Sequence, residues 1–96
     1  MKYRRKTWKA SEIEAFQFDG DMMTSDGKYY VPEWAVKALD GGILVFHDTG
    51  DLYIEDALSG QPCIVPVGDY IIRGIYGGVF TEMKNVFEET YELVEE

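Results

Sequence analysis

The sequence predicts an α+β domain, a small antiparallel β-rich sheet of about six strands that is rolled or forms a partly open barrel, with two short helices. Three observations point to this class. Short apolar runs recur about every ten residues, turn residues separate them, and only two short segments have helical features. This pattern favours a rolled antiparallel sheet over a parallel α/β fold. The 96 residues are expected to form a single domain, 1–96, with residues 1–9 as a basic N-terminal arm.

The first strand is expected at 13–18, where apolar and polar residues alternate modestly. The polar, glycine-bearing segment 19–28 then forms a loop or a loose hairpin connection. Segment 29–31 is a short extended piece.

A helix of about two turns is predicted over 32–39. Pro32 suits the first helical position, and Glu33 beside it complements the helix dipole. The Gly41-Gly42 pair ends the element. We expect Trp34 or Leu39 to pack on one face of the sheet.

Two apolar runs, 43–47 and 52–55, flank an Asp-Thr-Gly-Asp sequence and predict a β-hairpin. Segment 63–67 is a further short strand after a Ser-Gly turn. A second hairpin is predicted from 70–75 and 79–82, because the first of these runs is β-branched and aromatic and glycines follow it.

Asn85 and Glu88 have the spacing of a capping box, which predicts a helical turn at 86–89. The following residues, 90–94, alternate in polarity and are β-prone. We therefore expect a final strand there, pairing near residues 13–18.

Motifs at both ends of the chain resemble those of small proteins encoded by bacteriophages and prophages, mostly of Gram-positive hosts. The motifs are Gly68-Asp69-Tyr70-Ile71-Ile72-Arg73-Gly74, Gly78-Val79-Phe80, Phe87, Thr90-Tyr91-Glu92, Tyr3-Arg4-Arg5-Lys6 and Glu14-Ala15-Phe16-Gln17-Phe18. Members often have Cys-Lys-Pro before the final Phe, where this chain has Met83-Lys84-Asn85. The resemblance implies a phage or prophage origin and the cytoplasm of a host bacterial cell, but no activity.

Charge is distributed unevenly along the chain, whose formal net charge is −9. Five basic residues lie among the first nine, and from residue 10 onward four basic residues face eighteen acidic ones. An acidic body repels a phosphate backbone, so nucleic acid is not expected as a partner. The acidity has two open interpretations, which are solubility and attraction of a basic protein partner.

The composition gives little support to catalysis. His47 is the only histidine, and next to Asp48 it is expected to be an exposed hairpin residue and not a general base. Asp48, Asp51, Glu55 and Asp56 do not have the spacing of a calcium loop, and neither do Asp19, Asp21 and Asp26. Cys63, the only cysteine, excludes an internal disulfide and is expected in the core. We expect no enzyme activity, no metal, no cofactor and no membrane association.

Arg73 is the most informative charged residue, because it lies within a strand of isoleucines. If buried, it needs a carboxylate or several backbone carbonyls, such as those of the C-terminal segment, and Asp69, Glu88 and Glu92 are plausible acidic partners. Replacing it with alanine would then cost about 1–3 kcal/mol. The alternative role is to anchor a phosphate or carboxylate ligand.

Two functions follow from these features. The first is a non-enzymatic accessory protein that binds another protein, from the host or the phage, with self-association left open. The second is a small-molecule or nucleotide-binding module, for which a pocket next to Arg73 would be the sign. The candidate binding residues for both are Arg73, Tyr70, Tyr76, Tyr91 and Trp34.

Overall fold

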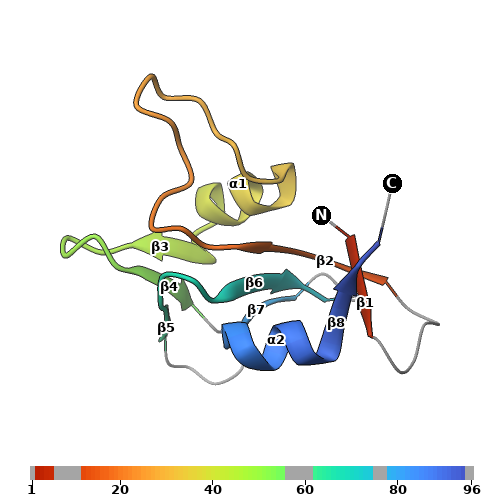
Figure 1. The fold of residues 1–96 in the computed structure, drawn as a ribbon. Coiled ribbons are helices and arrows are strands. Elements are labelled where there is room, and N and C mark those ends of the chain that lie inside the picture. Colours follow the sequence, from red (N-terminus) through yellow and green to blue (C-terminus); the bar gives the residue numbers. More distant parts are fainter. Residues whose placement is uncertain (1, 6–11, 56–61, 75–77, 95–96) are drawn as a thin grey trace.

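The computed structural model describes residues 2–5, 12–55, 62–74 and 78–94. Within these ranges the chain forms two antiparallel sheets and two helices (Figure 1). The predicted α+β class is confirmed, although the described strands number eight instead of about six and no closed barrel is formed. Neither described helix is long and apolar enough to cross a membrane.

The larger sheet has five strands in the order β7-β6-β2-β1-β8, and the smaller has three in the order β3-β4-β5. The strands of the larger sheet are β1 (Lys2–Arg5), β2 (Glu12–Gln17), β6 (Tyr70–Arg73), β7 (Val79–Glu82) and β8 (Tyr91–Leu93). Those of the smaller are β3 (Leu44–Phe46), β4 (Leu52–Glu55) and β5 (Pro62–Val65). Both predicted hairpins, β3–β4 and β6–β7, are confirmed.

Residues Lys2–Arg5 of the predicted basic N-terminal arm form strand β1 of the larger sheet. Strand β1 lies between β2 and β8, so β8 pairs with β1. The prediction that the last strand pairs near residues 13–18 is therefore wrong. Neighbouring acidic residues accommodate the basic strand, since Arg4 Nε lies 3.5 Å from Glu92 Oε1. Residues 6–9 of the predicted arm lie outside the described part of the chain.

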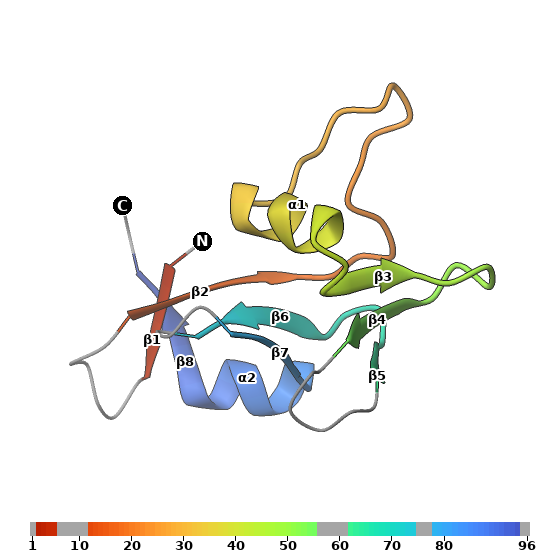
Figure 2. The same cartoon turned by 180° about the vertical axis from the view of Figure 1, so that it is seen from behind.

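Strand β6 is buried on both faces, because successive side chains of a strand point to opposite sides. Ile71 belongs to a core that contains Phe16 and Leu52 and is covered by α1 (Glu33–Asp40). Ile72 and Tyr70 belong to a second core under α2 (Lys84–Thr90). The two helices therefore lie on opposite sides of the five-stranded sheet, as Figures 1 and 2 show.

Helix α1 is close to its predicted position. Pro32 is the N-cap and not the first helical residue, and the helix ends at Asp40, immediately before Gly41. Trp34 packs on the sheet as expected, with its ring centroid 5.5 Å from that of Phe16.

The capping box predicted for α2 is wrong. The helix begins at Lys84, so Asn85 lies inside it and Met83 is the N-cap. The backbone N–H of Lys84 donates instead to Asp69 Oδ1 at 3.1 Å, from the turn before β6. An acceptor from a distant turn thus takes the place of a local cap.

The prediction that Cys63 is buried is also wrong, because its side chain is exposed. Strand β5 is an edge strand of the smaller sheet, and only Val65 at its end reaches the core. The apolar run therefore does not mark a buried strand.

Candidate interaction surface

Arg73 lies at the end of β6, where it forms an ion pair across the sheet. Its Nη1 donates to Glu14 Oε2 of β2 at 3.2 Å, and the two side chains are 46% and 38% exposed. The predicted carboxylate partner is thus present, but it is Glu14 and not Asp69, Glu88 or Glu92. Because Arg73 and Glu14 are neighbours in the sheet register, 59 residues apart in sequence, the pair depends on the β2–β6 pairing.

Because this ion pair is exposed, it should contribute less to the free energy of unfolding than a buried pair would. We predict that Arg73→Ala lowers the free energy of unfolding by at most about 1 kcal/mol, because water and salt screen an exposed ion pair. Urea unfolding of the wild type, Arg73→Ala and Arg73→Lys measures this. A loss of several kcal/mol for the alanine variant would show that the guanidinium is much less solvated than its exposure indicates.

A groove of about 550 Å³ lies next to Arg73, between α1 and the larger sheet. Its charged lining residues occur as the pairs Glu14–Arg73 and Glu33–Lys37, the second at 3.5 Å. Trp34 also lines the groove, and its buried Nε1 has no hydrogen-bond partner among the described residues. The pocket expected for a small-molecule site is therefore present, with both of its cations paired.

The tyrosines proposed as binding residues occupy different environments. Tyr70 is buried and its ring stacks on Phe87 with centroids 4.0 Å apart. Tyr91 is half-buried against the same phenylalanine at 4.9 Å. Both rings are parts of the second core and do not line the groove at Arg73. Tyr76 lies outside the described residues.

Tyr70 links stability to alkaline pH. Burial and a hydrogen bond from its hydroxyl to Glu88 Oε2, 2.9 Å long, raise the pKa of Tyr70 from 10.0 to about 12. In the unfolded chain the phenol loses its proton near its ordinary pKa, so between these two values the folded state holds more protons and stability falls as pH rises.

We therefore expect the urea midpoint of the wild type to be steady below about pH 10 and to fall between about pH 10 and about pH 12. Tyr70→Phe removes this titration, so its midpoint should fall less steeply over the same range. Equal slopes for the two proteins would contradict a protonated, buried Tyr70.

Residues 19–31 project from the molecule between β2 and α1 (Figure 1). Met23 and Tyr29 form a β-bridge, and the N–H of Thr24 donates to the carbonyl of Lys28 at 2.8 Å. At its base, Asp21 Oδ1 accepts from the N–H of Met22 at 2.8 Å. The loose hairpin connection is thus an ordered hairpin, which we call the projecting hairpin.

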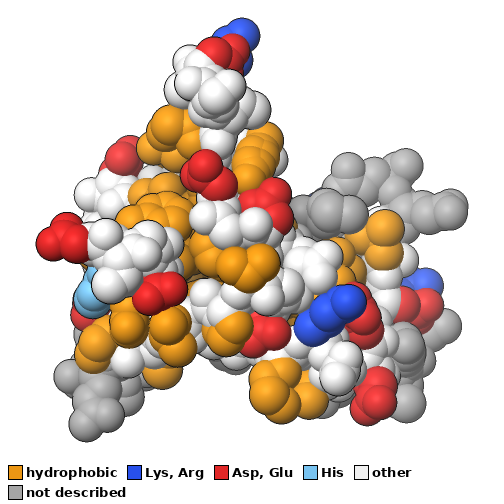
Figure 3. Space-filling model, turned by 60° about the vertical axis from the view of Figure 1, so that its left-hand side comes forward, with side chains coloured by type: hydrophobic (Ala, Val, Ile, Leu, Met, Phe, Trp, Pro, Cys, Tyr) orange, Lys and Arg blue, Asp and Glu red, His pale blue; other side chains and the backbone are white. Residues whose placement is uncertain are grey.

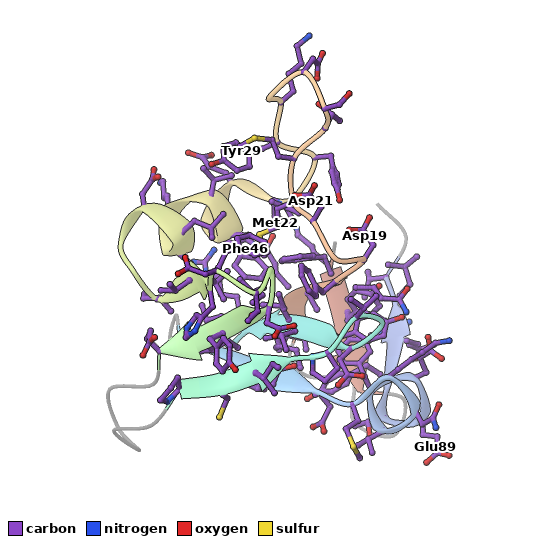
Figure 4. The ribbon with its side chains drawn as sticks, turned by 90° about the vertical axis from the view of Figure 1, so that its left-hand side faces the viewer. Asp19, Asp21, Met22, Tyr29, Phe46 and Glu89 are labelled. Carbon is purple, nitrogen blue, oxygen red and sulfur yellow. The ribbon has the colours of Figure 1, made fainter. Side chains whose placement is uncertain are left out.

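A hollow of about 400 Å³ lies where the projecting hairpin meets α1 and β3. It is lined by Asp21, Met22, Met23, Tyr29, Leu39, Asp40 and Phe46. Figure 4 shows Tyr29, Met22 and Phe46 on the same side of the molecule, with Asp21 beside them. We call this the Tyr29–Phe46 hollow. It joins three separate segments of the chain, which is why sequence reasoning missed it.

Tyr30 faces the other side of the projecting hairpin, as expected for neighbours in an extended segment. Its hydroxyl donates to Asp19 Oδ1 at 2.6 Å. This bond, with a backbone N–H from Asp21, lowers the pKa of Asp19, and it raises the pKa of Tyr30 to about 12. Asp19 and Tyr30 are thus engaged with each other.

Exposed apolar side chains gather on the face that contains the Tyr29–Phe46 hollow. Figure 3 shows them over the projecting hairpin and the smaller sheet, with acidic side chains between them. Two of the exposed members line the hollow itself, Tyr29 of the projecting hairpin and Phe46 of β3. A face of this composition suits contact with another protein.

The hairpin between β3 and β4 carries His47, Asp48 and Asp51, the residues that the sequence raised as candidates for general-base chemistry or a calcium loop. His47 is exposed and stacks on Tyr53 with centroids 3.9 Å apart. Asp51 accepts a hydrogen bond from the hydroxyl of Thr49 at 2.9 Å. Among the described residues, no group of histidine, cysteine and acidic side chains could hold a metal ion.

Comparison with known proteins identifies no relative, since no family model, no curated protein and no solved structure matches this chain.

Proposed function

We propose that the protein is a small non-enzymatic accessory protein that binds a protein partner carrying a basic segment. The binding surface is the face formed by the projecting hairpin, β3 and the Tyr29–Phe46 hollow. The phage or prophage origin implied by the terminal motifs is part of this proposal, and the partner is then a host or phage protein.

The Tyr29–Phe46 hollow carries the proposal. Aromatic rings that are 44% exposed at Tyr29 and 39% at Phe46 lie next to the carboxylates of Asp21 and Asp40. Exposed aromatic area favours burial against a partner, and acidic groups around it select a partner of opposite charge. A net charge of −9 adds long-range attraction for a basic protein.

Affinity capture from bacterial lysate, followed by mass spectrometry, tests the proposal. The bait is the wild type, the double variant Tyr29→Ser/Phe46→Ser, or the control Phe80→Ser. Phe80 is 45% exposed but lies on β7, away from this face, so it controls for loss of exposed aromatic area in general. Nuclease treatment separates direct partners from proteins held through nucleic acid.

We expect a basic partner that survives nuclease, is retained by Phe80→Ser and is lost with the double variant. Titration calorimetry with the purified partner then gives the affinity of each bait. Equal binding by the wild type and the double variant would show that the partner binds a different surface, which contradicts the proposed binding site. A partner that is held only through nucleic acid would refute the proposal.

A second candidate function rests on the groove of about 550 Å³ at Arg73, which is large enough for a metabolite. An anionic ligand there has to compete with Glu14 for the Arg73 guanidinium. Titration with inorganic phosphate and nucleotides, followed by NMR, tests it. Binding that Arg73→Gln weakens and Glu14→Gln strengthens would favour this function over the first.

A further inference from the structure

We infer that the Tyr29–Phe46 hollow binds the guanidinium group of an arginine in a basic segment of the partner. This inference rests on the proposed function and names the group that the surface recognises. It depends on three features of the hollow, which are its aromatic walls, its unbalanced carboxylates and its apolar floor.

The walls and the floor come from different parts of the fold. Tyr29 of the projecting hairpin and Phe46 of β3 supply the rings, and both are substantially exposed. Leu39, which is half-buried against the first core, also lines the hollow and supplies apolar surface, and Met22 packs behind it in the first core with only 1% of its surface exposed. Ring faces attract cations through their quadrupole, and an apolar floor suits the methylene stem of a long basic side chain.

The charges in the hollow are all negative. Asp21 and Asp40 line it, and no lysine or arginine does so among the described residues. Lys37 is three residues before Asp40 on α1 and is its nearest cation in sequence. It pairs with Glu33 instead, at 3.5 Å, and lines the groove on the Arg73 side. Asp21 Oδ1 accepts backbone N–H groups of Met22 and Met23, but among the described residues no cation pairs with Asp21 or Asp40, so their charge can meet a cation from outside.

The position of Asp40 strengthens this argument. It is the last residue of α1, where the negative end of the helix dipole disfavours a carboxylate. Helix stability therefore does not explain an acidic residue there, whereas recognition of a cation does.

Arginine fits these features better than lysine. A planar guanidinium stacks on an aromatic face and can at the same time donate to a carboxylate, whereas an ammonium is a more strongly hydrated point charge. A neutral apolar side chain would leave Asp21 and Asp40 without a countercharge at the interface. The structure thus favours arginine among the side chains that this hollow could receive.

Three blocked tripeptides, with a central arginine, lysine or citrulline between alanines, test the inference by ¹⁵N–¹H NMR titration of the full chain. Citrulline has nearly the shape of arginine but no charge. We expect the arginine peptide to give saturable shifts at Asp21, Tyr29, Asp40 and Phe46, with weaker binding of lysine and none of citrulline.

Two surface variants and two matched controls locate the site. Tyr29→Leu and Asp40→Asn should each weaken arginine binding about two- to fivefold, the range expected for one exposed cation–π or ionic contact. Tyr30→Leu, on the other side of the projecting hairpin, and Asp48→Asn, in the β3–β4 turn, should leave it unchanged. The spectrum of each free variant reports its fold.

Equal shifts with citrulline, or shifts centred on Glu14 and Glu33, would overturn the inference. Because the peptides replace the partner, this outcome is independent of the capture experiment. A captured partner with no arginine binding at the hollow would refute the inference alone, whereas arginine binding without any captured partner would leave it standing and refute the proposed function.

Discussion

Phe87→Ala is expected to lower the free energy of unfolding by about 3–5 kcal/mol, the range measured when a buried aromatic ring is truncated. Phe87 is 1% exposed and lies at the centre of the second core. Its ring stacks on that of Tyr70. It also contacts the ring of Tyr3 edge-on, and the centroids of Phe87 and Tyr3 are 4.9 Å apart. Alanine leaves a cavity that these rings cannot fill without losing their mutual contacts.

Urea unfolding followed by far-UV circular dichroism measures this loss. Small domains are stable by about 5–15 kcal/mol, so the variant should lose a large part of the wild-type stability. Phe80→Ala is the matched control, because Phe80 is 45% exposed and its truncation should cost much less. Similar losses for the two variants would mean that α2 is not held on the sheet through Phe87.

Elements defined by local signals could be predicted from the sequence. Turn residues between two apolar runs identified the β3–β4 and β6–β7 hairpins. Proline before an apolar periodic segment identified α1 within one residue. In each case the residues that decide the conformation lie within a few positions of one another.

Long-range pairing could not be read in the same way. Strand β1 joins β8, about ninety residues later in the chain, and nothing near either strand indicates its partner. The sequence likewise indicated that Arg73 needs an acidic partner. That this partner is Glu14 depends on the β2–β6 register, which places the two residues side by side. The Tyr29–Phe46 hollow has the same origin, since the projecting hairpin, α1 and β3 each supply part of it.

A local signal was nevertheless present for the double burial of β6. Tyr70, Ile71 and Ile72 are three consecutive apolar residues, which is typical of a strand covered on both faces. Ile71 faces the core under α1, and Ile72 faces the core under α2. One short strand thus holds the two cores together, and its two isoleucines offer a test of whether the cores unfold as one unit.

Ile71→Ala and Ile72→Ala should each lower the free energy of unfolding by about 2–5 kcal/mol, because both side chains are completely buried. The measurement is urea unfolding in a Trp8→Phe background followed by two probes, the fluorescence of Trp34 near the first core and far-UV circular dichroism for the whole fold. If β6 couples the two cores, both probes should report the same lowered midpoint for either variant.

The milder variants Ile71→Val, Ile72→Val and their combination allow a complete thermodynamic cycle, since each should cost about 0.5–1.5 kcal/mol and leave the protein folded. The side chains point to opposite faces and share the backbone of β6, so a departure from additivity of more than about 0.5 kcal/mol would measure the coupling that this backbone transmits between the two cores. Separate midpoints for the two probes in Ile72→Ala would instead show that α2 and its core can unfold while the core under α1 remains. In that case β6 would join two independently stable layers and not one cooperative fold.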